Sequence, residues 1–336
     1  MCIKNVTLDL MAISCRVTRG DLTESIHVAF AVVVGNNGQI LFSSGDPHYL
    51  TCIRSSLKPF QAAASIKAGA VDSVKFSEEE IALMCASHQG EQIHTDTAFS
   101  MLQKLDLTIE DYECGVHAPS DKKTRYDLVL TNKSISPLHN NCSGKHAGML
   151  ALAKKIGKEV KGYIKKDHPV QKVINDYICE ISESQDIQYE IDGCSAPVPF
   201  FTLETIANMF QKLALGEKIE LKRVFNAMAS HPLHVGGTDN FDSSFIQALD
   251  GRGVTKVGGE SVRGLSIKNT KYGPIGIAIK VLDGNFRVLP IATMKLLDHL
   301  EILEEDEKKQ LSRYSTKILK NHNNLEVGKI EAYIDF

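Results

Sequence analysis

Two strand-forming regions, one near each end of the chain, constrain the fold most strongly. His27 to Val34 is rich in valine, alanine and phenylalanine, and a Gly-Asn-Asn-Gly turn separates it from Gln39 to Ser43. Two such runs around an Asn-Gly turn predict a β-hairpin. Near the other end, Val262 to Ile267 and Ile275 to Val281 resemble strands, and an Asp-Gly-Asn turn leads into a further expected strand, Phe286 to Leu289.

Most of the chain between these regions has helical periodicity. Ser77 and Glu80 form a capping box that predicts a helix start, and Ile291 to about Leu303 forms an amphipathic stretch. Further helices are expected at 93–104, 144–155, 169–184, 202–213 and 218–229. Strands at both ends with helices between them predict a mixed α/β (α+β) fold with one antiparallel sheet assembled from both termini. We expect one domain over 1–336, with sheet segments at about 26–45 and 254–290, a helical lobe at about 76–250 and a helical tail at 304–336.

Composition excludes some classes of partner. Of the 336 residues, 43% are hydrophobic and 24% charged, and the net charge is −3. These values are ordinary for a globular protein that buries a core. They give no electrostatic reason to expect a nucleic acid or an anionic membrane as partner. A small polar molecule is the expected partner class.

The cysteines and the amino terminus predict a cytoplasmic protein. The eight cysteines contain no Cys-x-x-Cys pair and are too sparse for a disulfide scaffold. Lys4, Asp9 and Arg16 interrupt the apolar stretches near the start, so no secretory segment is expected. The apolar run from Ala29 to Val34 is far shorter than the roughly 20 residues of a membrane helix. The cysteines are Cys2, Cys15, Cys52, Cys85, Cys114, Cys142, Cys179 and Cys194.

The segment Arg-Ser-Ser-Leu-Lys-Pro at 54–59 carries the first candidate chemistry. It leads into an alanine-rich stretch that predicts a helix starting near Ser55 or Ser56, and Ser55 and Lys58 would then share a face. A serine needs a base to become a nucleophile, and a lysine acts as one only if its pKa falls well below about 10.4. Taken alone, Ser55 could cap a helix and Lys58 could be a surface cation.

Three further segments gather reactive side chains. Ser87 and His88 follow the capped helix, where a helix C-cap at Gly90 is the simpler interpretation. The run His-Asn-Asn-Cys-Ser-Gly-Lys-His at 139–146 precedes an apolar helix, and core packing does not require such a string of polar side chains. A carboxylate and a thiol, Asp192 and Cys194, follow a strand-like run. Both Cys142 and Cys194 are candidate ligands for zinc, or else buried thiols.

The last segment is Thr-Lys-Val-Gly-Gly-Glu-Ser at 255–261. A lysine followed by glycines next to a predicted strand resembles the Lys-Thr-Gly strand of serine β-lactamases, which places a cation beside the nucleophile. Taken alone, Lys256 would be a solvated turn residue.

The segments together resemble the asparaginase II family, the rhizobial type of L-asparaginase. The matching blocks are RSSLKP, CASHQGE, NNCSGKHAGML, DGCSAP and KVGGES, in this order, and the similarity extends from about residue 26 to residue 300. The resemblance implies the fold of serine β-lactamases and glutaminases, a homodimer and no organic cofactor. Gln89 and Asn240 depart from the pattern, since a small and a basic residue would be expected there.

The resemblance also implies roles for individual residues. Ser55 and Lys58 match one serine–lysine tandem, and Ser87 with Lys256 matches a second, for which Lys280 is a rival lysine. The implied zinc ligands are Cys142, Lys145 and Cys194, with zinc supporting substrate binding. The resemblance places Asp192 and His146 beside the substrate, and Arg54 and His88 are further candidates for contact with it.

The sequence therefore predicts an L-asparaginase that hydrolyses asparagine to aspartate and ammonia through an acyl-enzyme. Asp192 would bind the α-ammonium group, and Arg54 or His146 the α-carboxylate. The enzymatic alternatives are a glutaminase and a β-lactamase-like or peptidase-like acyl hydrolase. An alternative of another class is a non-catalytic, zinc-dependent binding protein.

Overall fold

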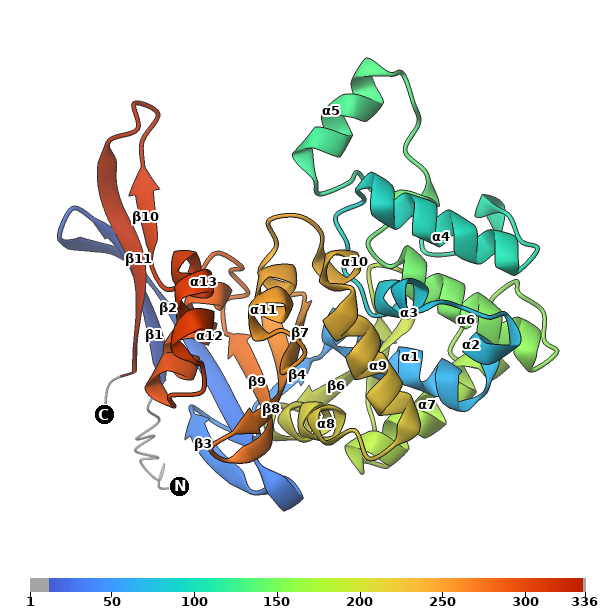
Figure 1. The fold of residues 1–336 in the computed structure, drawn as a ribbon, viewed down its shortest axis with the longest axis horizontal. Coiled ribbons are helices and arrows are strands. Elements are labelled where there is room, and N and C mark those ends of the chain that lie inside the picture. The colour runs from blue at the N-terminus through green and yellow to red at the C-terminus, as the bar shows by residue number, and fades with distance from the viewer. Residues whose placement is uncertain (1–11, 335–336) are drawn as a thin grey trace, which may run out of the picture.

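The structure, a computed structural model, describes residues 12–334. Its main sheet is antiparallel throughout and runs in the order β10-β11-β1-β2-β9-β8-β7, with β3 paired to β2 (Figure 1). The strands of this sheet are β1 (Ile13–Arg19), β2 (Leu22–Val34), β3 (Ile40–Ser44), β7 (Gly253–Gly258), β8 (Val262–Thr270), β9 (Gly273–Val281), β10 (Lys317–Lys320) and β11 (Glu326–Ile334). A small sheet has the order β4 (Leu50–Cys52), β6 (Pro197–Thr202), β5 (Tyr189–Ile191). The predicted antiparallel sheet from both ends of the chain is confirmed.

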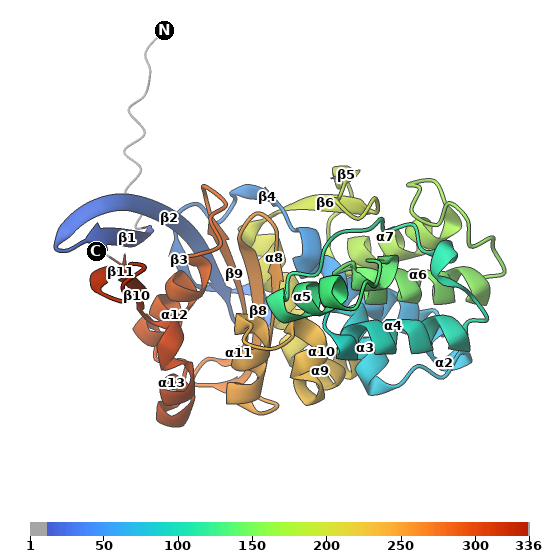
Figure 2. The same ribbon diagram turned by 90° about the horizontal axis from the view of Figure 1, so that it is seen from above.

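The helices fall into a lobe beside the sheet and two layers on its faces. The lobe contains α1 (Lys58–Lys67), α2 (Ala70–Ser73), α3 (Glu78–Met84), α4 (Gln92–Lys104), α5 (Lys122–Leu130), α6 (Ser143–Lys155), α7 (Pro169–Ser182), α9 (Ile219–Ser230) and α10 (Pro232–Gly236). The layers are formed by α8 (Leu203–Leu215), which packs on β8 and β9, and by α11 (Phe241–Leu249), α12 (Leu289–His299) and α13 (Glu305–Leu311). Figure 2 shows α12 and α13 along one side of the sheet.

The period-two alternation of the strands divides the apolar residues between two cores. Along β2, Ala31 and Val33 contact the core under α11 to α13, whereas Val32 and Val34 contact the core of α8 and the helical lobe. Glycines on the second face allow α8 to pack closely: a Cβ at Gly276 would lie 2.0 Å from the Ala207 carbonyl oxygen. The absence of a side chain at Gly276 thus lets α8 lie directly against the sheet.

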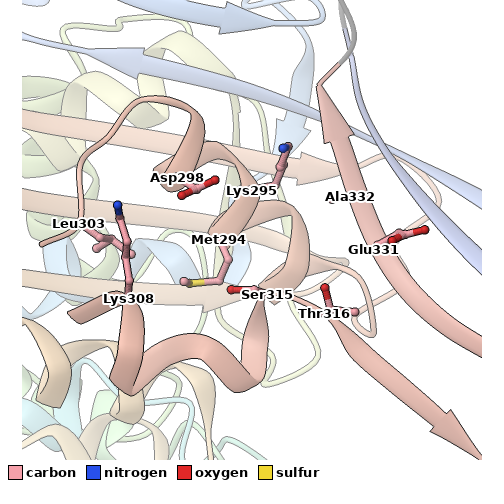
Figure 3. Close-up of a pocket in the computed structure, with 9 residues that line it drawn as sticks. All are labelled: Met294, Lys295, Asp298, Leu303, Lys308, Ser315, Thr316, Glu331 and Ala332. Atoms are coloured by element: carbon pink, nitrogen blue, oxygen red, sulfur yellow. The ribbon is translucent and has the colours of Figure 1, made fainter. Parts of the chain in front are cut away.

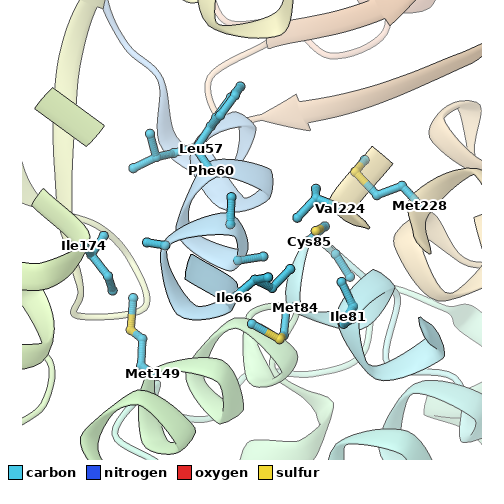
Figure 4. Packing of buried hydrophobic residues seen from close by; sticks show 14 of the residues in the cluster. Leu57, Phe60, Ile66, Ile81, Met84, Cys85, Met149, Ile174, Val224 and Met228 are labelled. Carbon is cyan, nitrogen blue, oxygen red and sulfur yellow. The ribbon is translucent and has the colours of Figure 1, made fainter. Parts of the chain in front are cut away.

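Helix α1 is the centre of the helical lobe. Every residue from Lys58 to Ile66 is buried, and the helix packs on α6, α7 and α9. Figure 4 shows Leu57, Phe60 and Ile66 among side chains from these neighbours. A lysine at the start of such a helix is held away from solvent, which matters for its chemistry.

Several local predictions are confirmed and others are wrong. The capping box is present, with the Ser77 N–H donating to Glu80 and the Glu80 N–H donating to Ser77. The expected strand from Phe286 to Leu289 is absent, because Pro290 is tolerated in a first helical turn and α12 begins at Leu289. The expected tail of helices at 304–336 is helical only at its start and ends in β10 and β11.

No helix within residues 12–334 is both long and apolar enough to cross a membrane. All seven cysteines of the described range are free thiols. Cys2 and the residues Lys4 and Asp9 lie outside the described residues.

Candidate active site

A groove between the helical lobe and the sheet brings the predicted serines together. It has a volume of about 630 Å³. The lobe contributes Arg54, Ser55, Ser87 and Asn141 to its lining, and the sheet side contributes Val257 to Glu260. Segments that lie far apart in the sequence therefore share one solvent-accessible space.

Another hollow, of about 310 Å³, lies among α12, α13 and β11 (Figure 3). Its charged groups, such as Lys308 and Glu331, are paired with Glu305 and Lys329. It contains none of the predicted site residues, so the groove is the better candidate.

Lys58 is the best-defined reactive group of the groove. Its Nζ lies 2.5 Å from the Ala86 carbonyl oxygen, 3.2 Å from that of Asn141 and 3.1 Å from Ser87 Oγ. The side chain is 1% exposed. The Lys58 amine donates to both backbone carbonyls and to the Ser87 hydroxyl, so all three of its partners are protein groups.

Ser55 lies in a 3₁₀ turn, η2 (Arg54–Leu57), directly before α1. It is partly exposed, it lines the groove, and its side chain makes no hydrogen bond within residues 12–334. The predicted helix start near Ser55 is thus a 3₁₀ turn that continues into α1 at Lys58. The direct side-chain contact of Lys58 is with Ser87, which the resemblance placed in the other tandem.

Lys256 lies on β7, next to the turn that carries Ser55. Ser56 Oγ donates to the Lys256 carbonyl oxygen over 2.9 Å, and a Cβ at Gly258 would lie 2.6 Å from the Ile53 carbonyl oxygen. Only a glycine lets the strand and the turn approach this closely. Burial lowers the pKa of Lys256 to about 7; the positive charge of Lys58 acts in the same direction, and Asp242 opposes it.

Lys280, the rival of Lys256, is placed differently. Its Nζ donates to the Glu260 carbonyl oxygen, and the side chain does not line the groove. Burial lowers its pKa, while the negative groups of Glu260 and Asp283 oppose the shift. Lys256 is the lysine whose titration responds to Lys58.

Two residues of this site escaped the sequence analysis. Asp242 is buried, with one carboxylate oxygen 2.6 Å from Arg263 Nη1 and the other 3.6 Å from Lys256 Nζ. Arg263 also stacks on the Phe241 ring, 4.2 Å from its centroid. The only signal was a second aspartate in Gly-Thr-Asp-Asn-Phe-Asp at 237–242, which sequence alone does not connect to Lys256.

The two departures from the family pattern have local explanations. Asn240 caps α11, accepting the Asp242 N–H over 2.9 Å. A side-chain acceptor is favoured at this position, and a basic residue has none. The Gln89 side chain donates to the Thr238 carbonyl oxygen over 2.5 Å.

The implied metal ligands form one buried cluster. Lys145 Nζ lies 2.7 Å from Cys194 Sγ, and Cys142 is 3% exposed. A hydrogen bond from Cys142 and the charge of Lys145 lower the pKa of Cys194 to about 5, and the same hydrogen bond raises that of Cys142 to about 12. The metal-free cluster is therefore a thiolate–ammonium pair with a neutral thiol.

Within residues 12–334, no three His, Cys, Asp or Glu side chains form a group that could hold a metal ion. Two thiols and an amine do converge here, and sulfur and nitrogen donors fit zinc. Zinc would therefore depend on Lys145 as its third ligand, after loss of the lysine proton.

Asp192 lies between this cluster and the groove. Arg54 Nε donates to Asp192 Oδ1 over 2.8 Å, and Asp192 Oδ2 is 3.7 Å from Cys194 Sγ. Burial opposes ionisation of Asp192, yet Lys145 and Arg54 hold its pKa below the usual value. An anion and a cation thus lie side by side, and the cation, Arg54, lines the groove.

The two predicted histidines are buried and do not line the groove. His88 accepts the Gly90 N–H, contacts Ser143 Oγ at 2.9 Å and stacks on His94, so its ring is held among protein groups. His146 Nδ1 lies 2.8 Å from the Tyr163 hydroxyl, while its Nε2 is buried without a partner within residues 12–334. Burial lowers the pKa of both imidazoles well below the usual range, which keeps them neutral.

Comparison with known proteins identifies the family. The family model of L-asparaginase II matches residues 15–332, nearly the whole chain. The chain therefore belongs to the L-asparaginase II family, a family of amide hydrolases. None of the curated proteins matches it.

Several solved structures are similar at low identity. Mglu, in its native form at 4.3 M NaCl, is 15% identical with a TM-score of 0.37, covering 82% of this chain and 61% of Mglu. A β-lactamase from Sphaerobacter thermophilus DSM 20745 is 14% identical with a TM-score of 0.40, covering 86% and 88%. A β-lactamase from Burkholderia ambifaria is 12% identical with a TM-score of 0.37, covering 75% and 84%. The chain thus spans less than two thirds of the length of Mglu.

Proposed function

We propose that this protein is an L-asparaginase that hydrolyses the side-chain amide of asparagine through a serine acyl-enzyme. The observation that carries the proposal is the buried Lys58 amine, held 3.1 Å from Ser87 Oγ at a groove that Ser55 also lines. Membership of the L-asparaginase II family supports an amide as the substrate.

In the proposed mechanism Ser55 is the nucleophile. Its hydroxyl is free of other protein partners in the described chain and lies just before the amino terminus of α1, whose N–H groups favour a developing anion. The Ser55 proton goes to Lys58, a C–O bond forms, and the C–N bond of the amide breaks. Ser87, in contact with Lys58, returns the proton to the departing ammonia, and water then hydrolyses the ester.

Lys256 supports these steps through its charge. With a pKa of about 7 it is partly neutral near neutral pH. When Lys256 is neutral, it exerts no charge repulsion on Lys58. A proton that Lys58 takes from the serine is then not destabilised by a second ammonium group. Lys256 therefore sets the pH range in which Lys58 can accept and hold a proton.

The head group of asparagine has two charges that the groove can match. Asp192 offers a carboxylate to the α-ammonium group, and Arg54 offers its guanidinium to the α-carboxylate. An amide without these charges would leave the Arg54–Asp192 ion pair in place and gain no charge-assisted contact from either group, so it would bind less well. This favours an amino-acid amide over a β-lactam.

We infer a supporting role for zinc. Cys142, Lys145 and Cys194 would hold it, and a zinc ion there would orient polar groups of the substrate through Lewis acidity. The protein residues alone then carry the proton transfers, because neither serine belongs to the cluster.

The test is ammonia release from asparagine, glutamine and a chromogenic β-lactam by the wild type, Ser55→Ala and Ser87→Ala. We expect activity on asparagine and its loss by several orders of magnitude in Ser55→Ala, whose fold stays intact. Ser73→Ala, at a remote helix where Ser73 Oγ bonds Ala70 O, is the matched control. An acyl-enzyme trapped on Ser87 in Ser55→Ala would reverse the order of the serines. Preference for glutamine or the β-lactam would make the protein one of the alternative hydrolases.

A homodimer in the cytoplasm is a further proposal. Helix α5 projects from the lobe and has no buried residue, and its Val129 and Leu130 are about four-fifths exposed, at 79% and 82% (Figure 1). Apolar surface of this kind favours a partner. Sedimentation should show a dimer that Leu130→Asp weakens, and a wild-type monomer would contradict the proposal.

The free cysteines support the second part of this proposal, the cytoplasm. Seven unpaired thiols in the described range suit a reducing compartment.

A further inference from the structure

The groove continues beyond the serines into a second hollow. This hollow has a volume of about 400 Å³ and shares Asp239, Phe286, Pro290 and Tyr314 with the groove. Because the two spaces share four lining residues, they adjoin each other and together form a trough. It leads away from Arg54 and Asp192, which line or adjoin only the first part.

The trough is larger than asparagine requires. A cavity of several hundred Å³ is typical for drug-sized ligands, and the groove alone has about 630 Å³. In the hydrolysis of asparagine the leaving group is ammonia, which needs almost no room. The additional space is therefore available to a larger amine.

The walls of the second hollow indicate the chemistry of such an amine. Phe286 and Tyr314 offer aromatic surface, and Arg287, Arg313 and Lys317 offer three positive charges against the single carboxylate of Asp239. Arg313 pairs with that carboxylate at 3.2 Å, and Arg287 contacts His27. Lys317 is exposed and has no ion pair within residues 12–334.

We propose that the site also hydrolyses N-substituted aspartyl amides whose departing amine carries an acidic group, with that group bound at Lys317 and Arg313. The inference rests on the proposed function, because the aspartyl part would bind at Arg54 and Asp192 as asparagine does. The chemistry is unchanged: the serine forms the same ester, the C–N bond breaks, and the amine leaves with the proton that Lys58 returns through Ser87. Water then releases aspartate.

The experiment compares three substrates: asparagine, β-aspartyl-glutamate and β-aspartyl-lysine. The wild type should release glutamate from the first dipeptide with a kcat/KM about ten-fold above that for the lysine dipeptide, because charge complementarity at an exposed rim is modest. This preference should shrink at high salt, which screens exposed charges.

Lys317→Glu should lower kcat/KM for β-aspartyl-glutamate about ten-fold and leave asparagine hydrolysis within about two-fold, since reversing an exposed charge replaces a weak attraction by a weak repulsion. Lys320→Glu is the matched control. It lies on the same strand, where side chains alternate in direction, and it does not line the hollow. It should leave all three substrates unaffected.

The outcomes separate the two proposals. Hydrolysis of asparagine without hydrolysis of either dipeptide overturns this inference and leaves the proposed function in place. Equal effects of Lys317→Glu on both dipeptides also overturn it, because the hollow would then not recognise the acidic group. Folded protein that hydrolyses none of the three substrates refutes the proposed function, and the inference with it.

Discussion

Asp242→Asn tests whether Lys256 sets the pH dependence of the reaction. The carboxylate lies 3.6 Å from Lys256 Nζ and favours its charged form. At an effective dielectric constant of about 20, unit charges about 4 Å apart interact by about 4 kcal/mol. Since about 1.4 kcal/mol corresponds to one pKa unit, removing the charge should lower the pKa of Lys256 by up to about three units.

The assay is the pH dependence of kcat/KM for asparagine. In the wild type, activity should rise on the acid side with a midpoint near 7, as Lys256 loses its proton. In Asp242→Asn the midpoint of this acid-side rise should move to lower pH by at least about one unit, because the Lys256 amine then stays neutral at lower pH. Asp250→Asn, at the other end of α11 and exposed, should leave the midpoint unchanged.

Stability is measured in parallel. Arg263 loses its charged partner, and breaking a buried ion pair costs about 3–5 kcal/mol, although the Asn oxygen can still accept one hydrogen bond from Arg263. Urea denaturation should therefore show a folded but destabilised variant. If the folded variant keeps the wild-type midpoint, or its midpoint rises, Lys256 is not the titrating group.

Two other predictions concern the base and the metal. Lys58→Met should reduce kcat about as much as Ser55→Ala, because the two groups act as a unit, and should cost about 1–3 kcal/mol of stability in urea, because the carbonyls of Ala86 and Asn141 lose their donor. Near-normal turnover would exclude Lys58 as the base. Metal analysis should find one zinc per chain, and chelation should raise KM more than it lowers kcat. Complete loss of kcat that zinc restores would show that the serine account is incomplete.

The sequence alone predicted what depends on neighbouring residues. The hairpin after Val34, the capping box at Ser77 and the antiparallel character of the sheet follow from short-range patterns of hydrophobicity and turn chemistry. The blocks around Ser55, Ser87 and Cys142 could also be recognised, because each concentrates reactive side chains within a few residues. These features need no knowledge of which distant segments meet.

The tertiary structure decided what depends on contacts between distant segments. The expected helical tail became β10 and β11 because β1, at the opposite end of the chain, offers an edge for pairing. The approach of Lys58 to Ser87, and of Asp242 to Lys256, likewise arises where separate elements pack together. Burial then gives Lys256 its low pKa and leaves His88 with partners inside the protein. The sequence indicates which side chains are candidates for catalysis. Desolvation and charge pairing arise only on folding, so the folded chain determines which of these side chains have the pKa and the partners that catalysis needs.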